Sequence, residues 1–170
     1  MATHHNISGE LTTELLAMGD NISVRSISLS NVAAFKPVSA DLFIKNDSGK
    51  FYIFKNLSIP AGVSCVHDFT FNNRSDGYGL YIKLKAADTF TLTGTIDVTG
   101  TNTSVPGTNT LFTKELTIGD SIVVSGETRI IESITSDTVA TVTAAWGSDL
   151  ANDTDGIECT PIALVDVIIS

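Results

Sequence analysis

A short hairpin pattern near the middle of the chain constrains the fold more than any other feature. Two runs rich in β-branched residues, 122–124 and 128–131, are separated by a segment that contains the Ser-Gly pair at 125–126. A tight turn with glycine between two such runs predicts a β-hairpin. The Gly-Asp pair at 119–120 precedes the first run and predicts a further turn. This part of the chain is therefore expected to be antiparallel β-structure.

Strand patterns recur along the rest of the chain. Residues 38–45 and 50–55 are separated by turn residues, and further strands are expected at 63–71 and 78–85. Strands that follow one another every 8 to 15 residues or so, with no long helical period between them, are typical of antiparallel sandwiches and barrels. We therefore predict an all-β protein.

A second group of strands follows the first. Residues 99–110 are rich in Gly, Thr and Asn and are expected to form an exposed loop, and Trp146 is expected to fill the core or an edge of this module. The strands expected in this group are 94–98, 121–124, 128–134 and 139–143.

The apolar segment at the C-terminal end suggests how the two groups are connected. Residues 162–170 have the composition of a strand, and we expect them to return to the first group, which makes the second group an insertion. Residues 1–20 fit either a short helix that ends at Gly19 or an arm that packs on a neighbour. The predicted division is an N-terminal arm at 1–20, an antiparallel β-sandwich of 21–88 plus 162–170, and an inserted small β-barrel (SH3-like) domain at 89–161.

The net charge of the chain limits the classes of binding partner that can be expected. The formal net charge is −9, with 10 Lys and Arg against 19 Asp and Glu. This balance argues against broad nucleic-acid binding, which needs cations for the phosphates, and against docking to anionic lipid. The first residues lack the basic and apolar regions of a signal peptide, so we expect Cys65 and Cys159 to be buried reduced thiols rather than a disulfide.

Enzyme signatures are missing from the sequence. It contains no Gly-rich phosphate loop, metalloprotease helix or Cys-x-x-Cys motif. His4 and His5 lie in the predicted arm, and His67 and Asp68 are adjacent in a predicted strand, where they face opposite ways. We therefore predict a protein that is not an enzyme and that has no catalytic residues, no cofactor and no obligatory metal site.

One acidic cluster leaves calcium binding open. Asp149, Asp153, Asp155 and Glu158 supply oxygens near glycine residues, as half of a calcium loop does. Ala151 stands where an EF-hand loop needs Asp, and Ile162 where it needs Glu. A solvated loop with Asx turns is the favoured interpretation. Asp120 is interpreted as a turn residue that binds backbone amides, not as a catalytic carboxylate.

The aromatic residues of the first module also allow two interpretations. They could form an exposed platform for carbohydrate, but strand aromatics more often fill the core of a sandwich, which is the interpretation that we favour. The residues concerned are Phe43, Phe51, Tyr52, Phe54, Phe69, Phe71, Tyr78 and Tyr81.

Two resemblances follow from these segments. The first module resembles small β-sandwich virion proteins of tailed phages at 40–44, 51–62, 80–84 and 165–170. In that pattern the strand at 80–84 is followed closely by the last strand, whereas some seventy residues intervene here. The second module resembles a barrel found in many phage virion and tail proteins, with Gly-Thr, Phe-Thr and Leu-x-x-Gly-Asp motifs. Together the resemblances cover most of residues 21–170.

The resemblance implies a capsid decoration or cement protein that binds and stabilises the assembled head shell. Its partners would be the major capsid protein and further copies of itself, with a homotrimer favoured. It would lie on the exterior of the virion head, after synthesis in the host cytoplasm, and would bind neither nucleic acid nor membrane. The alternatives are a tail, neck or baseplate component, a receptor- or glycan-binding module and, last, a hydrolase.

Overall fold

The chain is an all-β protein that divides into two compact units. The computed structural model describes residues 2–73, 77–151 and 156–170. Unit 1 contains Met1–Ala86 and Ala163–Ser170, and unit 2 contains Ala87–Ile162. Unit 1 is an antiparallel β-sandwich, and unit 2 is a separate β-structure inserted into it. The boundaries of the inserted unit lie within two residues of the expected 89–161, whereas unit 1 also includes the residues that were expected to form a separate arm at 1–20.

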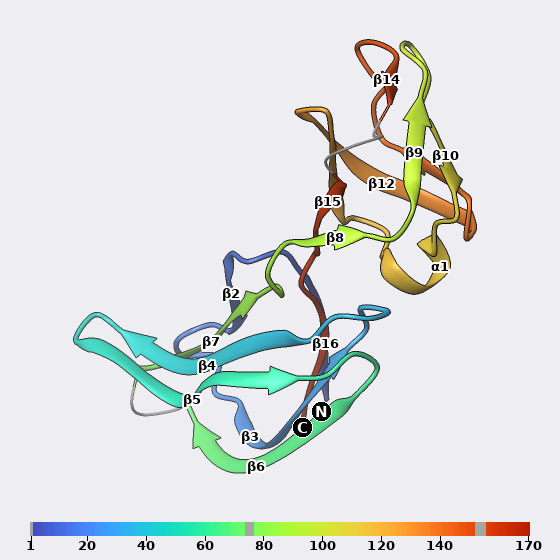
Figure 1. The fold of residues 1–170 in the computed structure, drawn as a ribbon. Helices are drawn as coiled ribbons and strands as arrows, with labels where there is room; N and C mark the ends of the chain where they lie inside the picture. The colour runs from blue at the N-terminus through green and yellow to red at the C-terminus, as the bar shows by residue number, and fades with distance from the viewer. Residues whose placement is uncertain (1, 74–76, 152–155) are drawn as a thin grey trace. The chain divides into compact units, whose positions relative to one another are not determined.

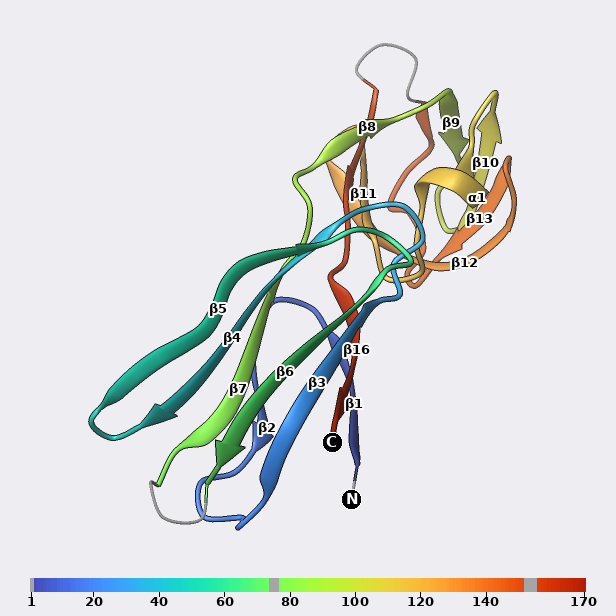
Figure 2. The ribbon, with the colours of Figure 1, turned by 90° about the horizontal axis from the view of Figure 1, so that it is seen from below.

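The first sheet of unit 1 contains both ends of the described chain. Its strand order is β1 (Thr3–Ser8), β16 (Leu164–Ile169), β3 (Ser23–Asn31) and β6 (Ser64–Asn72), and all neighbours are antiparallel. Thr3 lies opposite Ile169. Figure 2 shows β1 and β16 side by side, with β3 next to them. The C-terminal strand therefore pairs within the first module, as expected.

The second sheet of unit 1 has the order β2 (Thr12–Leu16), β7 (Gly79–Lys85), β4 (Val38–Asn46) and β5 (Gly49–Ile59). These strands are again antiparallel, and β4 and β5 form the hairpin predicted around the turn that follows Lys45 (Figure 1). The side chain of Asn46 closes this turn, because its Oδ1 accepts the backbone N–H groups of Ser48 and Gly49.

The core of unit 1 lies between the two sheets. Alternate residues on each strand point inward, as the two-residue period of a strand requires. The fully buried members include Ile27, Leu29, Leu42, Leu80, Ile82, Leu84 and Val165.

The structure contradicts the prediction of an N-terminal arm at 1–20. Residues 3–8 and 12–16 form β1 and β2, an edge strand of each sheet, and not a helix. Ile7, Leu15 and Leu16 are buried in the core of unit 1. The strand pattern of β1 was not recognised in the sequence because most of its residues are polar. A strand with one face towards solvent needs apolar side chains only on its other face.

The described residues of unit 2, 87–151 and 156–162, form one sheet and a short helix. The sheet order is β14 (Leu150–Ala151), β9 (Thr95–Val98), β10 (Ser104–Thr108), β13 (Val139–Val142), β12 (Glu127–Ser136), β11 (Ser121–Val124), β15 (Ile157–Thr160) and β8 (Phe90–Leu92). Trp146 is buried in its core with Phe112, Ile122 and Val142, as expected for this tryptophan. The SH3-like form of the insert remains a prediction.

Two details of unit 2 differ from the expectation. The helix α1 (Phe112–Glu115) lies between the strands expected at 94–98 and 121–124, where no helix was predicted, and β10 lies inside the expected loop at 99–110. Phe112 and Leu116 are both buried, and their spacing of four residues places them on one side of a helical turn. In β10 only Val105 is fully buried, so the strand has no apolar run that could be recognised.

Candidate functional site

A row of side chains crosses the outer face of the second sheet of unit 1. Glu14 of β2 lies opposite Tyr81 of β7, Tyr81 lies opposite Phe43 of β4, and Phe43 lies opposite Tyr52 of β5. Their neighbours on the same strands, such as Leu42, point into the core. Three aromatic side chains therefore stand together on the side of the sheet that faces away from the core.

The three rings and a lysine pack as one group. The Phe43 and Tyr81 rings are stacked, with centroids 5.8 Å apart and planes at 12°, and the Phe43 and Tyr52 centroids are 5.7 Å apart. Lys50 Nζ lies 3.6 Å from the Phe43 centroid and 4.5 Å from that of Tyr52. Lys55 Nζ lies 5.1 Å from the Tyr52 centroid. The Lys50 ammonium and the rings of Tyr52 and Tyr81 cover Phe43, which is only 2% exposed although it is not part of the hydrophobic cluster between the sheets.

A hydrogen bond fixes one end of the row. The Tyr81 hydroxyl donates to Glu14 Oε1 over 2.7 Å. This bond, together with desolvation and the negative charge of Glu14, raises the pKa of Tyr81 above 10.0, because all three favour the neutral phenol. The bond joins β2, an edge strand, to β7 through side chains as well as through the backbone.

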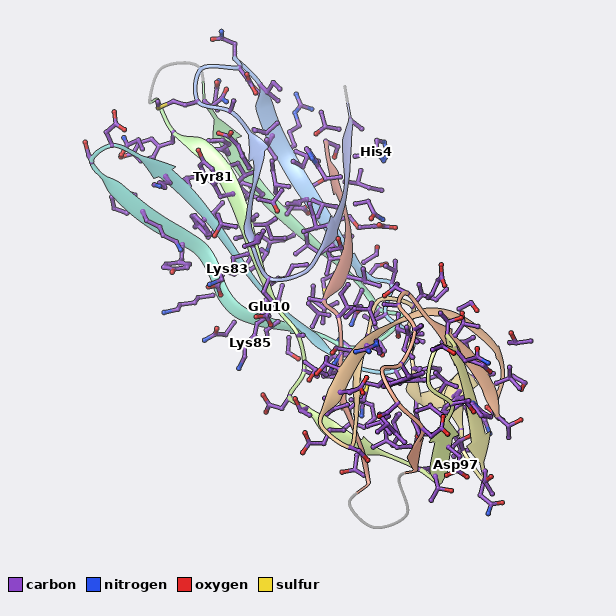
Figure 3. All side chains as sticks on the ribbon, turned by 90° about the horizontal axis from the view of Figure 1, so that it is seen from above. His4, Glu10, Tyr81, Lys83, Lys85 and Asp97 are labelled. Atoms are coloured by element: carbon purple, nitrogen blue, oxygen red, sulfur yellow. The ribbon has the colours of Figure 1, made fainter. Side chains whose placement is uncertain are left out.

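A pocket of about 230 Å³ lies on the same sheet. Figure 3 shows Tyr81, Lys83 and Lys85 along one strand, with Glu10 near the two lysines. Both carboxylates of the pocket bind backbone: Glu10 Oε1 accepts the N–H of Ala86, and Asp41 Oδ1 accepts the N–H of Asn56, each over 2.7 Å. The residues that line the pocket are Glu10, Ser39, Asp41, Asn56, Lys83, Leu84 and Lys85.

This face collects half of the cations of the chain. Five of the ten Lys and Arg residues are exposed on β4, β5 and β7, accompanied by three carboxylates, those of Glu10, Glu14 and Asp41. The surface therefore carries a positive balance in a chain with a net charge of −9. We call it the lysine-aromatic face. It is made of Glu10, Glu14, Asp41, Phe43, Lys45, Lys50, Tyr52, Lys55, Tyr81, Lys83 and Lys85.

The outer face of the first sheet has a different chemistry. One row across it contains His4, Ile168, Ser28 and Val66, in which Ile168 and Val66 are 40% and 68% exposed. Hydroxyl pairs and an amide–carboxylate pair tie the neighbouring strands together: Ser30 with Ser64, Ser26 with Ser170, and Asn6 with Asp166. We call this surface the hydroxyl face, defined by these ten residues.

The histidines are spread over unit 1. His4 and His5 lie in β1 and not in a flexible arm; His4 belongs to the hydroxyl face, and His5 points the other way. His5 Nε2 is buried and has no hydrogen-bond partner among the described residues. His67 and Asp68 are adjacent in β6, as predicted, and the His67 ring contacts those of Phe54 and Phe69.

The acidic cluster considered for calcium lies partly outside the described residues, because Asp153 and Asp155 are not among them. Asp149 Oδ1 accepts the backbone N–H of Gly100 over 2.8 Å, and Glu158 lies in β15. In the segments 2–73, 77–151 and 156–170, no group of three or more His, Cys, Asp or Glu side chains is placed to hold a metal ion.

The interpretation of Asp120 as a turn residue is confirmed. Its carboxylate is buried and accepts the backbone N–H groups of Thr117 and Ile162, each over 2.8 Å. Gly119 before it has φ +98°. Cys65 and Cys159 are not joined in a disulfide; Cys159 is buried, as expected, whereas Cys65 is only half-buried.

The prediction that the aromatic residues fill the core is correct only in part. Phe54, Phe69, Phe71 and Tyr78 belong to or pack against the core of unit 1. Phe51 and Tyr52 are 55% and 44% exposed, and Phe43 and Tyr81 lie on the outer face. The alternation with Leu42 and Leu80 was the signal for this, since residues of opposite parity on a strand point to opposite faces.

Comparison with known proteins identifies no relative: no family model, curated protein or solved structure matches the chain. The described residues form no helix with the length and apolar composition that crossing a bilayer requires.

Proposed function

We propose that the chain is a structural protein of a tailed-phage virion, and specifically a capsid decoration or cement protein that binds the assembled head shell. The segments that carry the resemblance support this proposal, because they belong to β4, β5, β7 and β16, four strands of the same sandwich. The proposed location is the exterior of the virion head, after synthesis in the host cytoplasm.

The observation that carries the proposal is the chemical difference between the two outer faces of the sandwich. The lysine-aromatic face has charged and aromatic groups, and the hydroxyl face has paired hydroxyls with exposed Val66 and Ile168. A cement protein bridges neighbouring subunits, and two unlike faces suit two unlike contacts. Contact area that exists only in the assembled state shifts the assembly equilibrium towards that state.

The pocket supports contact rather than catalysis. The carboxylates of Glu10 and Asp41 each accept a backbone N–H, so Glu10 fixes the backbone at the end of β7 and Asp41 joins β4 to β5. A glycan platform needs aromatic ring faces that are open to a sugar, whereas lysine ammonium groups lie over the rings of Phe43 and Tyr52. This arrangement favours a protein partner over a glycan, and a tail, neck or baseplate component is the alternative that remains.

The proposed partners are the major capsid protein and further copies of this chain, with a trimer favoured. Neither nucleic acid nor membrane is proposed as a partner. Location tests the proposal directly. Virions that carry this protein with an electron-dense label are expected to show the label over the head. A label confined to the tail, with a bare head, would overturn the assignment to the shell.

A matched functional test uses heads assembled without the protein. Such heads are expected to open at a lower temperature than complete heads, and adding back the purified protein should restore the difference. Heads of equal thermal stability with and without the protein would contradict a cement role. The same comparison at several protein concentrations would reveal saturation of the sites on the shell.

A further inference from the structure

The net charge of the chain resides entirely in the inserted unit. Residues 1–86 and 163–170 contain eight acidic and eight basic residues, so unit 1 is formally neutral. Residues 87–162 contain 11 acidic and 2 basic residues, so unit 2 carries −9. The positive lysine-aromatic face therefore belongs to the unit without net charge, and the charge that complements it belongs to the other unit.

We propose that the lysine-aromatic face binds the acidic inserted unit of a second copy of this chain. The inference rests on the self-association included in the proposed function, but not on a location in a virion. Lys45 and Lys83 are exposed on this face, and unit 2 exposes Asp97, Glu132 and Glu158 on three different strands. Opposite charges on two surfaces steer their encounter and select the partner.

The lysine-aromatic face also offers an exposed aromatic ring and a pocket, which add contact area to the charge of its lysines. Tyr52 is 44% exposed, and Lys50 and Lys55 lie over its ring, so an ordered aromatic group stands among the cations. Tyrosine is enriched at protein interfaces because a rigid ring buries a large area with little loss of conformational entropy. The pocket beside it offers room of about 230 Å³ for an acidic side chain near Lys83.

The symmetry of such a contact follows from its two unlike surfaces. Where the face on one copy meets the inserted unit of the next copy without the reciprocal contact, the interface is heterologous. Heterologous contacts form closed rings when the rotation between copies closes. A trimer, the oligomer favoured by the resemblance, is one such ring.

The test is a charge swap on the purified full-length protein, with mass measured by sedimentation equilibrium. The wild type is expected to associate at low ionic strength and to dissociate as salt is added, since the screening length falls from roughly 10 Å at 0.1 M to about 3 Å at 1 M. Lys45→Glu with Lys83→Glu should weaken association by roughly a hundredfold or more, because like charges would then face each other. Lys50 is left unchanged because it covers Phe43.

The control replaces two cations elsewhere. Arg25→Glu with Lys36→Glu changes the net charge by the same amount at positions of unit 1 outside the face, and the association constant should stay within about twofold of the wild type. Asp97→Lys, Glu132→Lys and Glu158→Lys in unit 2 should also weaken association. A variant that combines these three substitutions with Lys45→Glu and Lys83→Glu again has opposite charges on the two surfaces. It should recover most of the association of the wild type.

Three outcomes would overturn the inference. A wild type that is monomeric at every protein concentration in low salt would show that no second copy binds. Association that persists unchanged in Lys45→Glu with Lys83→Glu would assign the contact to another surface. Failure of the combined variant to associate, while circular dichroism shows it to be folded, would exclude charge pairing as the basis. Labelled virions test the proposed location separately from all three.

Discussion

The Asp120 carboxylate accepts the backbone N–H of Ile162 over 2.8 Å, so a turn after α1 is tied to the last residue of unit 2. The other oxygen of Asp120 accepts the N–H of Thr117. Asp120→Ala would leave two amide groups without these acceptors, and we expect it to destabilise unit 2 by about 1–3 kcal/mol. Chemical denaturation measures the change. Asp97→Ala, at an exposed position of β9, is the control and should change stability by less than about 0.5 kcal/mol.

Trp146 combines a buried ring with a polar indole N–H group. The side chain is 1% exposed, and its Nε1 has no hydrogen-bond partner among the described residues. Trp146→Ala should cost roughly 3–5 kcal/mol because it leaves a cavity. Trp146→Phe keeps most of the apolar volume and removes the unsatisfied donor, so it should cost less than about 2 kcal/mol. Both variants lose the single tryptophan of the chain and with it the tryptophan fluorescence, so unfolding should be followed by circular dichroism. Equal losses in the two variants would contradict this explanation.

The raised pKa of Tyr81 predicts a dependence on alkaline pH. A folded pKa above the unfolded value of 10.0 means that the folded state holds the phenol proton more tightly. The resulting stability is therefore present below pH 10.0 and is lost as pH rises through the folded pKa. Glu14→Gln keeps an acceptor but removes the charge, and should lower the Tyr81 pKa when the ring is titrated by NMR. Glu10→Gln is the control, because that carboxylate binds the N–H of Ala86. An unchanged Tyr81 titration in Glu14→Ala, which removes both the hydrogen bond and the charge, would refute the assigned cause.

The position of β16 predicts which deletions unit 1 can survive. This strand lies between β1 and β3, and Val165 and Val167 belong to the core. Deletion of residues 163–170 should therefore unfold the sandwich, whereas replacement of residues 87–162 by a short Gly/Ser linker should leave it folded. NMR amide dispersion distinguishes the two results. A folded fragment of residues 1–86 alone, beside an unfolded linker variant, would reverse the prediction.

The sequence predicted best where local turn chemistry and strand period agree. β11 and β12 meet at Val124 and Glu127, and Ser125 and Gly126 between them both have positive φ, as a tight hairpin turn of this kind requires. The sequence predicted poorly where an element is short or polar. The helix α1 has only four residues, too few to establish a period, and β1 reads Thr-His-His-Asn-Ile-Ser.

The candidate site could not be predicted because it depends on which strands are neighbours. Phe43 and Tyr81 are 38 positions apart in the chain, and only the pairing of β4 with β7 brings them opposite each other. Alternation along each strand indicates that these rings share a side with charged residues. It does not indicate that Lys50 lies over Phe43, since that contact also requires the pairing of β4 with β5.

The place of β16 in its sheet also sets the order in which the protein can fold during synthesis. β16 follows all of unit 2 in the chain, yet it lies between β1 and β3. While the ribosome adds residues 87–162, the first sheet lacks an inner strand and its core is incomplete. Unit 2 has its own sheet and core, and domains fold as units during synthesis. The inserted unit is therefore free to fold first, and the sandwich, with both of its outer faces, is completed only after it.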